Sequence, residues 1–121
     1  MSDVPHSIVC EARKEHFLRG MIRTRDIRVA LVCDGKAVGF YTPRVAKDGL
    51  FRVGPVYIIP EFRKRGLLRS LYESMPIALK ACIEHGNVAS EAAHERCGFV
   101  RWRRYSNGWW WYRDARANPH A

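Results

Sequence analysis

Acidic residues are scarce in this sequence. Asp and Glu number 12 against 21 Lys and Arg, so the formal net charge is +9. Arginine makes up 16 of those 21 bases, and its planar guanidinium matches phosphate geometry better than a lysine ammonium does. The charge favours an anionic partner, which is a polyanionic cofactor, a nucleic acid or an acidic protein. A solvated basic surface would account for the same charge.

Metal-binding and disulfide patterns are missing. The four cysteines, Cys10, Cys33, Cys82 and Cys97, form no CxxC pair, and the five histidines show no metal-ligand spacing. Apolar or small residues lie close to each cysteine in the sequence. We therefore expect reduced, structural thiols and no metal site.

Long apolar runs are missing as well. No stretch approaches the ~18 residues that a membrane helix needs. The opening MSDVPHS carries an acid and a proline where a secretory signal has bases and then an apolar run. We expect one compact, soluble, cytoplasmic domain over residues 1–121, with a flexible tail at 113–121 and no membrane partner.

The first half of the chain reads as one helix followed by three strands. Apolar positions recur at helical spacing between residues 7 and 23. The runs 27–33 and 37–41 flank an Asp-Gly hairpin signal, and 50–59 is a third strand that Gly54-Pro55 interrupts as a bulge or a splayed edge. These strands predict an antiparallel meander.

The stretch YIIPEFRKRGLLRSL, residues 57–71, organises the rest. It reads as an apolar strand, a turn at Pro60, a basic loop that ends at Gly66, and a helix start. A helix start presents unpaired backbone N–H groups and partial positive charge, which together bind phosphate. The alternative is an ordinary basic helix start on a solvated face.

The second half reads as a crossover and a hairpin. The helix that begins after Gly66 should end at Pro76, and strand 78–83 should then return parallel to the third strand. A second helix spans 88–97, and Asn107-Gly108 joins two aromatic strands, 99–105 and 109–113. The pattern predicts an α+β protein.

Two segments carry a family resemblance. Residues 57–68 are similar to the strand, proline and R-x-x-G-x-G/A helix start of the GNAT superfamily of acyl-CoA N-acyltransferases. Residues 87–99, NVASEAAHERCGF, fall in register with the family element N-x-x-A-x-x-x-Y-E-K-x-G-F. The resemblance covers about residues 26–113. It implies a mixed, mostly antiparallel twisted sheet with a β-α-β crossover, helices on both faces and a reduced N-terminal helical region.

The resemblance implies acetyl-CoA or another acyl-CoA as co-substrate. It assigns to this ligand the third strand, the basic loop, the helix start and two residues of the second element. In chain order these residues are Tyr57, Ile58, Ile59, Arg63, Lys64, Arg65, Gly66, Leu67, Leu68, Arg69, Asn87 and Ser90. Two departures stand out: Leu68 replaces a small residue, and His94 occupies the usual Tyr position.

The implied reaction is direct acyl transfer to a primary amine. His94 is then the expected proton donor to the leaving thiolate, and its alternatives are an exposed helix residue or a polar contact to Glu91. Glu61 is the candidate general base, with Glu73 or a water relay as alternatives. Asn87 has an alternative role as a helix N-cap.

Three functions stay open on the sequence. The first is an N-acyltransferase whose acceptor is an amine on a protein or a small molecule. The second is a nucleic-acid-binding or nucleobase-modifying protein of the phage Mom type, favoured by Arg between Trp and Tyr in RWRRY and WWWYR; alternate aromatics there, Trp109 and Trp111, are expected to face the core. The third is a non-catalytic interaction module. A homodimer is compatible with each.

Overall fold

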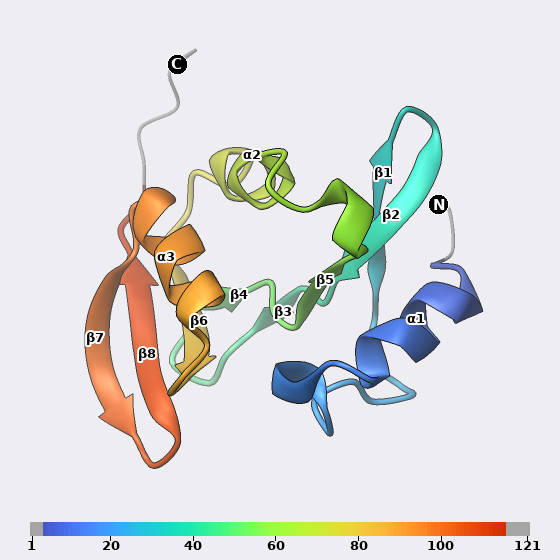
Figure 1. Ribbon diagram of the computed structural model, residues 1–121. Helices are drawn as coiled ribbons and strands as arrows, with labels where there is room; N and C mark the ends of the chain where they lie inside the picture. Colours follow the sequence, from blue (N-terminus) through green and yellow to red (C-terminus); the bar gives the residue numbers. More distant parts are fainter. Residues whose placement is uncertain (1–3, 116–121) are drawn as a thin grey trace. The chain divides into compact units, whose positions relative to one another are not determined.

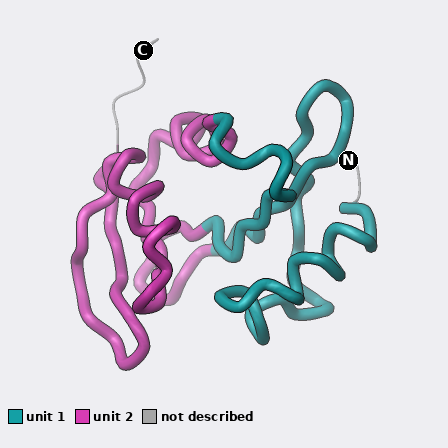
Figure 2. The backbone as a smooth tube through the Cα atoms, in the orientation of Figure 1, with its two compact units in different colours: residues 1–44, 53–65 teal, residues 45–52, 66–121 magenta. Residues whose placement is uncertain are grey.

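The computed structural model describes residues 4–115. The chain forms two compact units, which Figure 2 distinguishes by colour. Unit 1 comprises residues 1–44 and 53–65, and unit 2 comprises residues 45–52 and 66–121. Each unit is described by itself, with the element labels of Figure 1. The single domain expected from the sequence stays a prediction.

Unit 1 is a three-stranded antiparallel sheet with one helix packed on it. Its sheet has the order β1-β2-β5. Asp34 and Gly35 make the β1–β2 turn with φ values of 52° and 78°, as the Asp-Gly signal predicts. The elements are α1 (His6–Arg13), η1 (His16–Leu18), β1 (Val29–Cys33), β2 (Lys36–Tyr41), β5 (Val56–Ile58) and η2 (Pro60–Phe62).

The core of unit 1 joins α1 to β2 and β5. Three apolar residues of α1 pack against the rings of Phe40 and Tyr57, with Ile8, Val9 and Ala12 all buried. Gly39 lets the two strands approach closely, because a Cβ atom there would collide with the Tyr57 carbonyl oxygen. This packing fixes β5, the strand that leads into the basic loop.

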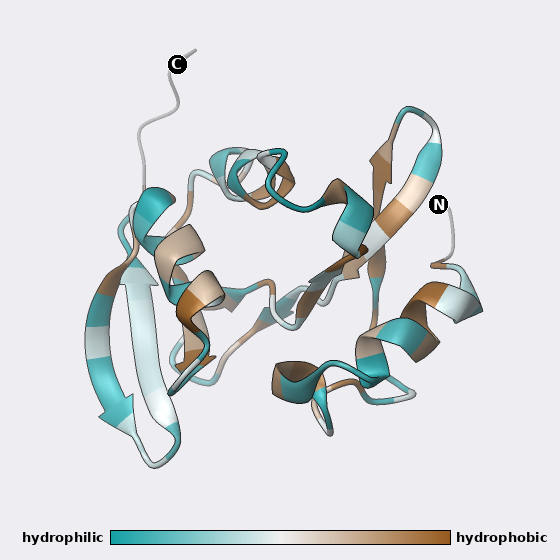
Figure 3. Cartoon of the chain, viewed as in Figure 1, coloured by the Kyte–Doolittle hydropathy of each residue, from teal (hydrophilic) through white to brown (hydrophobic). Residues whose placement is uncertain are grey.

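Unit 2 is built on a five-stranded mixed sheet in the order β3-β4-β6-β8-β7. β4 and β6 run parallel with α2 between them in the chain, and β7 and β8 form the predicted aromatic hairpin. Figure 3 colours most of β7 hydrophilic, whereas β1 of unit 1 is hydrophobic. The elements are β3 (Arg44–Val45), β4 (Phe51–Arg52), α2 (Leu67–Glu73), β6 (Leu79–Glu84), α3 (Val88–Arg96), β7 (Val100–Tyr105) and β8 (Gly108–Arg113).

Both helices of unit 2 pack on the same face of its sheet. Trp111 and Arg113 point to one side of β8, since side chains alternate along a strand. Arg113 donates to the Tyr72 carbonyl of α2, while Arg101, opposite Trp111, lies 3.8 Å from Glu91 of α3. The buried core between these layers includes Tyr72, Leu79, Ile83, His94, Phe99 and Trp111.

The α+β class, the two hairpins and the parallel crossover are confirmed, but three expected boundaries are wrong. The helix expected over 7–23 ends at Arg13, because Glu15 is extended (ψ 133°) and only a short 3₁₀ turn follows. The strand expected over 50–59 is two strands, β4 and β5, in different sheets. α2 ends at Glu73, earlier than the end that Pro76 predicts.

The expected tail also begins too early. Arg113 is the last residue of β8 and is 2% exposed. Residues 116–121 of that tail lie outside the described residues. Within the described part of the chain, no helix has the length and apolar character needed to cross a membrane.

Candidate active site

The basic loop between β5 and α2 has an unusual backbone. Lys64 has a φ of 62° and Gly66 a φ of 77°, so two residues of this short loop lie in the left-handed region. Glycine adopts that region without strain, whereas a lysine does so only at some cost. The family pattern places a glycine at position 66, and the structure gives the reason for it.

The start of α2 has no side-chain cap. Gly66 is the N-cap residue, and among the described residues no side chain caps the first turn. The first intrahelical bond runs from the Ser70 N–H to the Gly66 carbonyl at 2.9 Å. The N–H groups of Leu67, Leu68 and Arg69 therefore have no partner within the helix and are available to water or an anion.

Charges around the loop are partly neutralised. Arg63 lies 2.7 Å from Glu15 and also donates to the Ile58 carbonyl, and Arg69 lies 2.9 Å from Glu73. Both ion pairs are substantially exposed, so each contributes little to stability. Lys64 and Arg65 are exposed, and within residues 4–115 no ion pair involves either of them.

β5 is an edge strand of the sheet of unit 1. Tyr57 lies opposite Phe40, and the Ile59 N–H donates to the Val38 carbonyl of β2. Hydrogen-bonded positions alternate in an antiparallel ladder, so the backbone of Ile58 faces the outer edge. Its carbonyl accepts from Arg63 Nε at 2.8 Å. The Ile58 N–H is thus directed away from β2.

His94 is buried in unit 2, between α2 and α3. Its Nδ1 lies 2.7 Å from the Ser90 carbonyl oxygen, which can only accept, so Nδ1 carries a hydrogen. In the neutral ring Nε2 then accepts a hydrogen bond from the Tyr72 hydroxyl at 2.8 Å. The Phe99 ring packs against both side chains, with ring centroids 4.8 Å and 5.0 Å away.

Burial changes the proton chemistry of this pair. Loss of solvent lowers the pKa of His94 below its ordinary value, and the bond to Ser90 offsets this only in part. Burial also raises the pKa of the Tyr72 hydroxyl strongly. The imidazolium form, on which the expected acid role depends, is therefore disfavoured in the folded protein.

The remaining predicted residues have simple local settings. Asn87 caps α3, because its Oδ1 accepts from the Ser90 N–H at 3.3 Å. The Ser90 hydroxyl lies 3.3 Å from His94 Nδ1. Glu61 is exposed in η2. The assignment of these residues to acyl-CoA or to catalysis stays a prediction.

Arg113 is a residue of this region that the sequence does not single out. Its guanidinium donates to the carbonyls of Tyr72 (2.9 Å), Met75 and Ile77 (3.1 Å). These carbonyls lie at and just after the end of α2, where helix carbonyls lack partners. Arg113 thus anchors α2, and only its place at the end of an aromatic strand signals this in the sequence.

Two arginines of the aromatic hairpin lie over its own rings. Arg101 lies 5.5 Å from the ring centroids of Trp109 and Trp111, and Arg103 lies 4.2 Å from that of Trp102. Trp111 is buried and Trp109 half-buried, as expected. Trp102, 36% exposed, is the tryptophan most open to solvent. This arrangement accounts for the interleaved pattern by internal cation–π packing.

The architecture resembles solved acetyltransferases. A GNAT family acetyltransferase from Elizabethkingia anophelis with acetyl-CoA bound matches with a TM-score of 0.66, at 11% identity, over 93% of this chain and 92% of that one. The PaiA N-acetyltransferase from Thermoplasma acidophilum, in complex with coenzyme A, gives 0.61 at 13% identity, over 74% and 61%.

The chain has a GNAT fold. The ribosomal-protein-S18-alanine N-acetyltransferase from Escherichia coli also matches, with a TM-score of 0.55 at 16% identity over 80% of this chain and 74% of that one. This chain spans less than two thirds of the Thermoplasma acetyltransferase. No protein-family model matches the sequence, and no curated protein is similar to it in sequence.

Proposed function

We propose that this protein is a GNAT-type N-acyltransferase that transfers an acetyl or other acyl group from acyl-CoA to a primary amine. The observation that carries the proposal is the start of α2 within a GNAT fold. Gly66 leaves the first turn without a side-chain cap, and Lys64 and Arg65, which directly precede Gly66 in the chain, form no ion pair among residues 4–115. These groups fit a pyrophosphate.

The proposal also assigns a role to β5. The amide-rich pantetheine arm pairs with the outer edge of this strand, where the Ile58 backbone is directed. The Ile58 N–H is the candidate donor to the oxyanion of the tetrahedral intermediate. Tyr57 and Ile59 face β2 and hold the strand in place.

Transfer proceeds in one displacement. The neutral amine nitrogen attacks the thioester carbonyl carbon, the carbon–sulfur bond breaks, and coenzyme A leaves as a thiolate that takes up a proton. The amine loses a proton to Glu61 or to water. An amide and a free thiol are the products, and no oxidant or metal enters the balance.

His94 is the candidate proton donor, and its hydrogen bonds determine the path that the proton takes to the thiolate. Its Nε2 is bonded to the Tyr72 hydroxyl, so a proton from an imidazolium passes through that hydroxyl to reach the thiolate. Because burial lowers the pKa of His94, this route operates only at a pH below the ordinary pKa of a histidine. At higher pH the thiolate takes its proton from water.

Mass spectrometry of acceptors incubated with isotopically labelled acetyl-CoA tests the function. We expect a labelled acetyl group on an amine, and loss of most labelling when Gly66 is replaced by Val. Gly35→Val, a change at a hairpin glycine with the same left-handed conformation, is the matched control. Binding of acetyl-CoA without transfer to any amine would leave the chain as a non-catalytic cofactor-binding module.

A further inference from the structure

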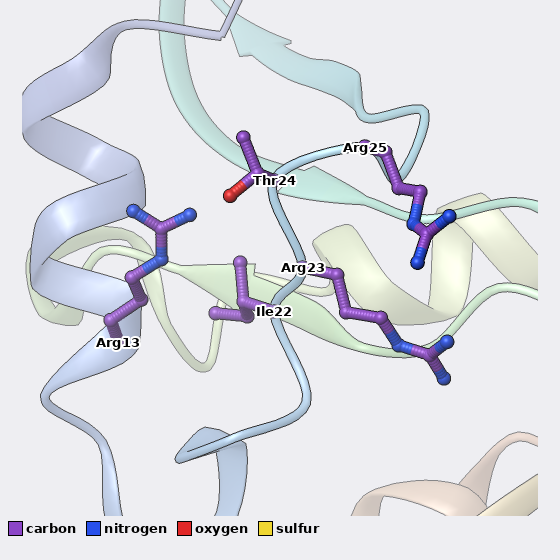
Figure 4. Close-up of a pocket in the computed structure, with 5 residues that line it drawn as sticks. All are labelled: Arg13, Ile22, Arg23, Thr24 and Arg25. Carbon is purple, nitrogen blue, oxygen red and sulfur yellow. The ribbon is translucent and has the colours of Figure 1, made fainter.

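A basic pocket in unit 1 lies outside everything assigned above. It has a volume of about 550 Å³ and is formed by the last turn of α1 and the loop that precedes β1 (Figure 4). We define the arginine pocket by its lining residues, Arg13, Ile22, Arg23, Thr24 and Arg25. Three of these five side chains are guanidiniums, which suit an anionic ligand.

Within the described part of the chain, no carboxylate forms an ion pair with any of the three guanidiniums, those of Arg13, Arg23 and Arg25. The acids nearest in sequence have other partners. Glu11 pairs with Lys14, Glu15 pairs with Arg63, and Asp26 accepts a hydrogen bond from the backbone N–H of Arg23.

Like charges held at one pocket repel each other, so an arrangement of this kind gains from a bound polyanion. The rest of the loop adds to the positive charge, since Arg19 and Arg28 flank the pocket residues in the sequence. Arg28 donates to the Arg23 carbonyl at 2.9 Å and so helps to hold the loop in shape.

The arrangement of the side chains indicates what kind of anion fits. Figure 4 shows Arg13 and the Thr24 hydroxyl on one side of the loop and the guanidiniums of Arg23 and Arg25 on the other. Guanidiniums on both sides of the loop favour a ligand with several phosphates over a single phosphate. A chain of phosphates that passes over the loop meets all three arginines, and the hydroxyl adds a further phosphate donor.

We infer that the arginine pocket binds the phosphodiester backbone of a single-stranded nucleic acid. A flexible strand enters a concave pocket, whereas a duplex presents its phosphates on a rigid convex surface. This inference does not depend on acyl transfer. It also differs from stacking on the aromatic hairpin, where Arg101 and Arg103 already lie over rings of the hairpin itself.

The experiment is a fluorescence-anisotropy titration of the full chain, without acyl-CoA, with labelled single-stranded DNA and RNA of mixed sequence. With three phosphate contacts, we expect affinity to fall about 20-fold between roughly 50 and 200 mM salt, because the log–log slope is about −0.7 per phosphate. In the triple variant Arg13→Gln, Arg23→Gln, Arg25→Gln the slope becomes shallower by about 2.

The matched control removes three exposed charges elsewhere. Lys47→Gln, Arg96→Gln, Arg104→Gln carries the same change in net charge, and none of these residues forms an ion pair among residues 4–115. We expect this control to keep most of the affinity. If both triple variants lose affinity equally, binding is nonspecific charge attraction and the inference is wrong.

Three competitors complete the test. Equal or tighter binding of duplex DNA, of ATP, or of poly-glutamate at matched charge would overturn the assignment to a single-stranded phosphate backbone. Circular dichroism checks that each variant folds. The single variants Arg13→Gln and Arg25→Gln replace the triple variant if it does not fold, and each should make the slope shallower by about 0.7.

Discussion

The Tyr72→Phe substitution tests the buried pair that joins α2 to α3. It removes the hydroxyl that donates to His94 Nε2 at 2.8 Å and leaves the ring contact with Phe99 unchanged. His94 is 7% exposed, so its Nε2 would be left buried without a donor. The expected loss in the free energy of unfolding is about 1–3 kcal/mol.

Urea denaturation at pH 7.5 measures this loss. Tyr41→Phe is the matched control, because among the described residues its hydroxyl makes no hydrogen bond; we expect a change within about 0.5 kcal/mol. In a His94→Leu background, the Tyr72→Phe change should leave the free energy of unfolding unchanged or raise it. In that background the Tyr72 hydroxyl has already lost its partner, so its removal leaves no further polar group unpaired. Equal losses in the two backgrounds would refute the reasoning about this pair.

The same pair predicts a pH dependence. Because burial lowers the pKa of His94, the unfolded chain takes up a proton near its ordinary value of about 6.5 while the folded chain does not. The free energy of unfolding should therefore fall as the pH drops from about 6.5 towards the folded-state pKa, by at most about 1.4 kcal/mol per pH unit. His94→Gln should remove that contribution, and an unchanged pH profile would contradict it.

Three further substitutions test other contacts. Arg113→Met should lower the free energy of unfolding by about 3 kcal/mol, since three carbonyls at and just after the end of α2 lose their donor; a loss below about 1 kcal/mol in thermal denaturation would argue against the anchor. Gly39→Ala should destabilise by about 2 kcal/mol or more, because its Cβ meets the Tyr57 carbonyl, and a neutral result in the same assay would be inconsistent with the close approach. Gly66→Ala should weaken acetyl-CoA binding about tenfold, since an alanine in the left-handed conformation costs about 1–2 kcal/mol. An unchanged affinity in calorimetry would show that the loop does not bind acetyl-CoA.

Local signals predicted the turns well. The Asp34-Gly35 and Asn107-Gly108 pairs specify tight hairpins through backbone preference alone, and both hairpins form. The start of α2 at Gly66 follows from the same kind of local preference. These features depend on a few adjacent residues, which a sequence displays directly.

Features that depend on distant partners could not be predicted. Residues 50–59 read as one strand, yet Phe51 pairs with Leu79 and Tyr57 pairs with Phe40 in another sheet. The apolar pattern of residues 50–59 predicts strands with a buried face, but it does not identify the strand with which each part pairs. Arg113 stands in the sequence where the last strand meets the expected tail, and its burial cannot be predicted because the carbonyls that accept from it lie some forty residues earlier in the chain.

The candidate site also combines local features, which the sequence predicts, with features that depend on distant partners. The residues RKRG at 63–66 predict the loop and the helix start. The burial of His94 against Tyr72, in contrast, depends on how α2 and α3 pack. Because of this packing, His94, the expected proton donor, is mostly a neutral imidazole in the folded protein. The arginine pocket likewise needs α1 to return to the loop before β1, which charge along the chain does not reveal.

Isothermal titration of the full chain with acetyl-CoA tests the central proposal most directly. We expect one acetyl-CoA per chain at submillimolar affinity, with coenzyme A alone binding comparably and Arg65→Gln weakening both ligands more than Arg104→Gln does. The absence of binding heat at millimolar acetyl-CoA, from a chain shown to be folded, would contradict an acyl-CoA-dependent function.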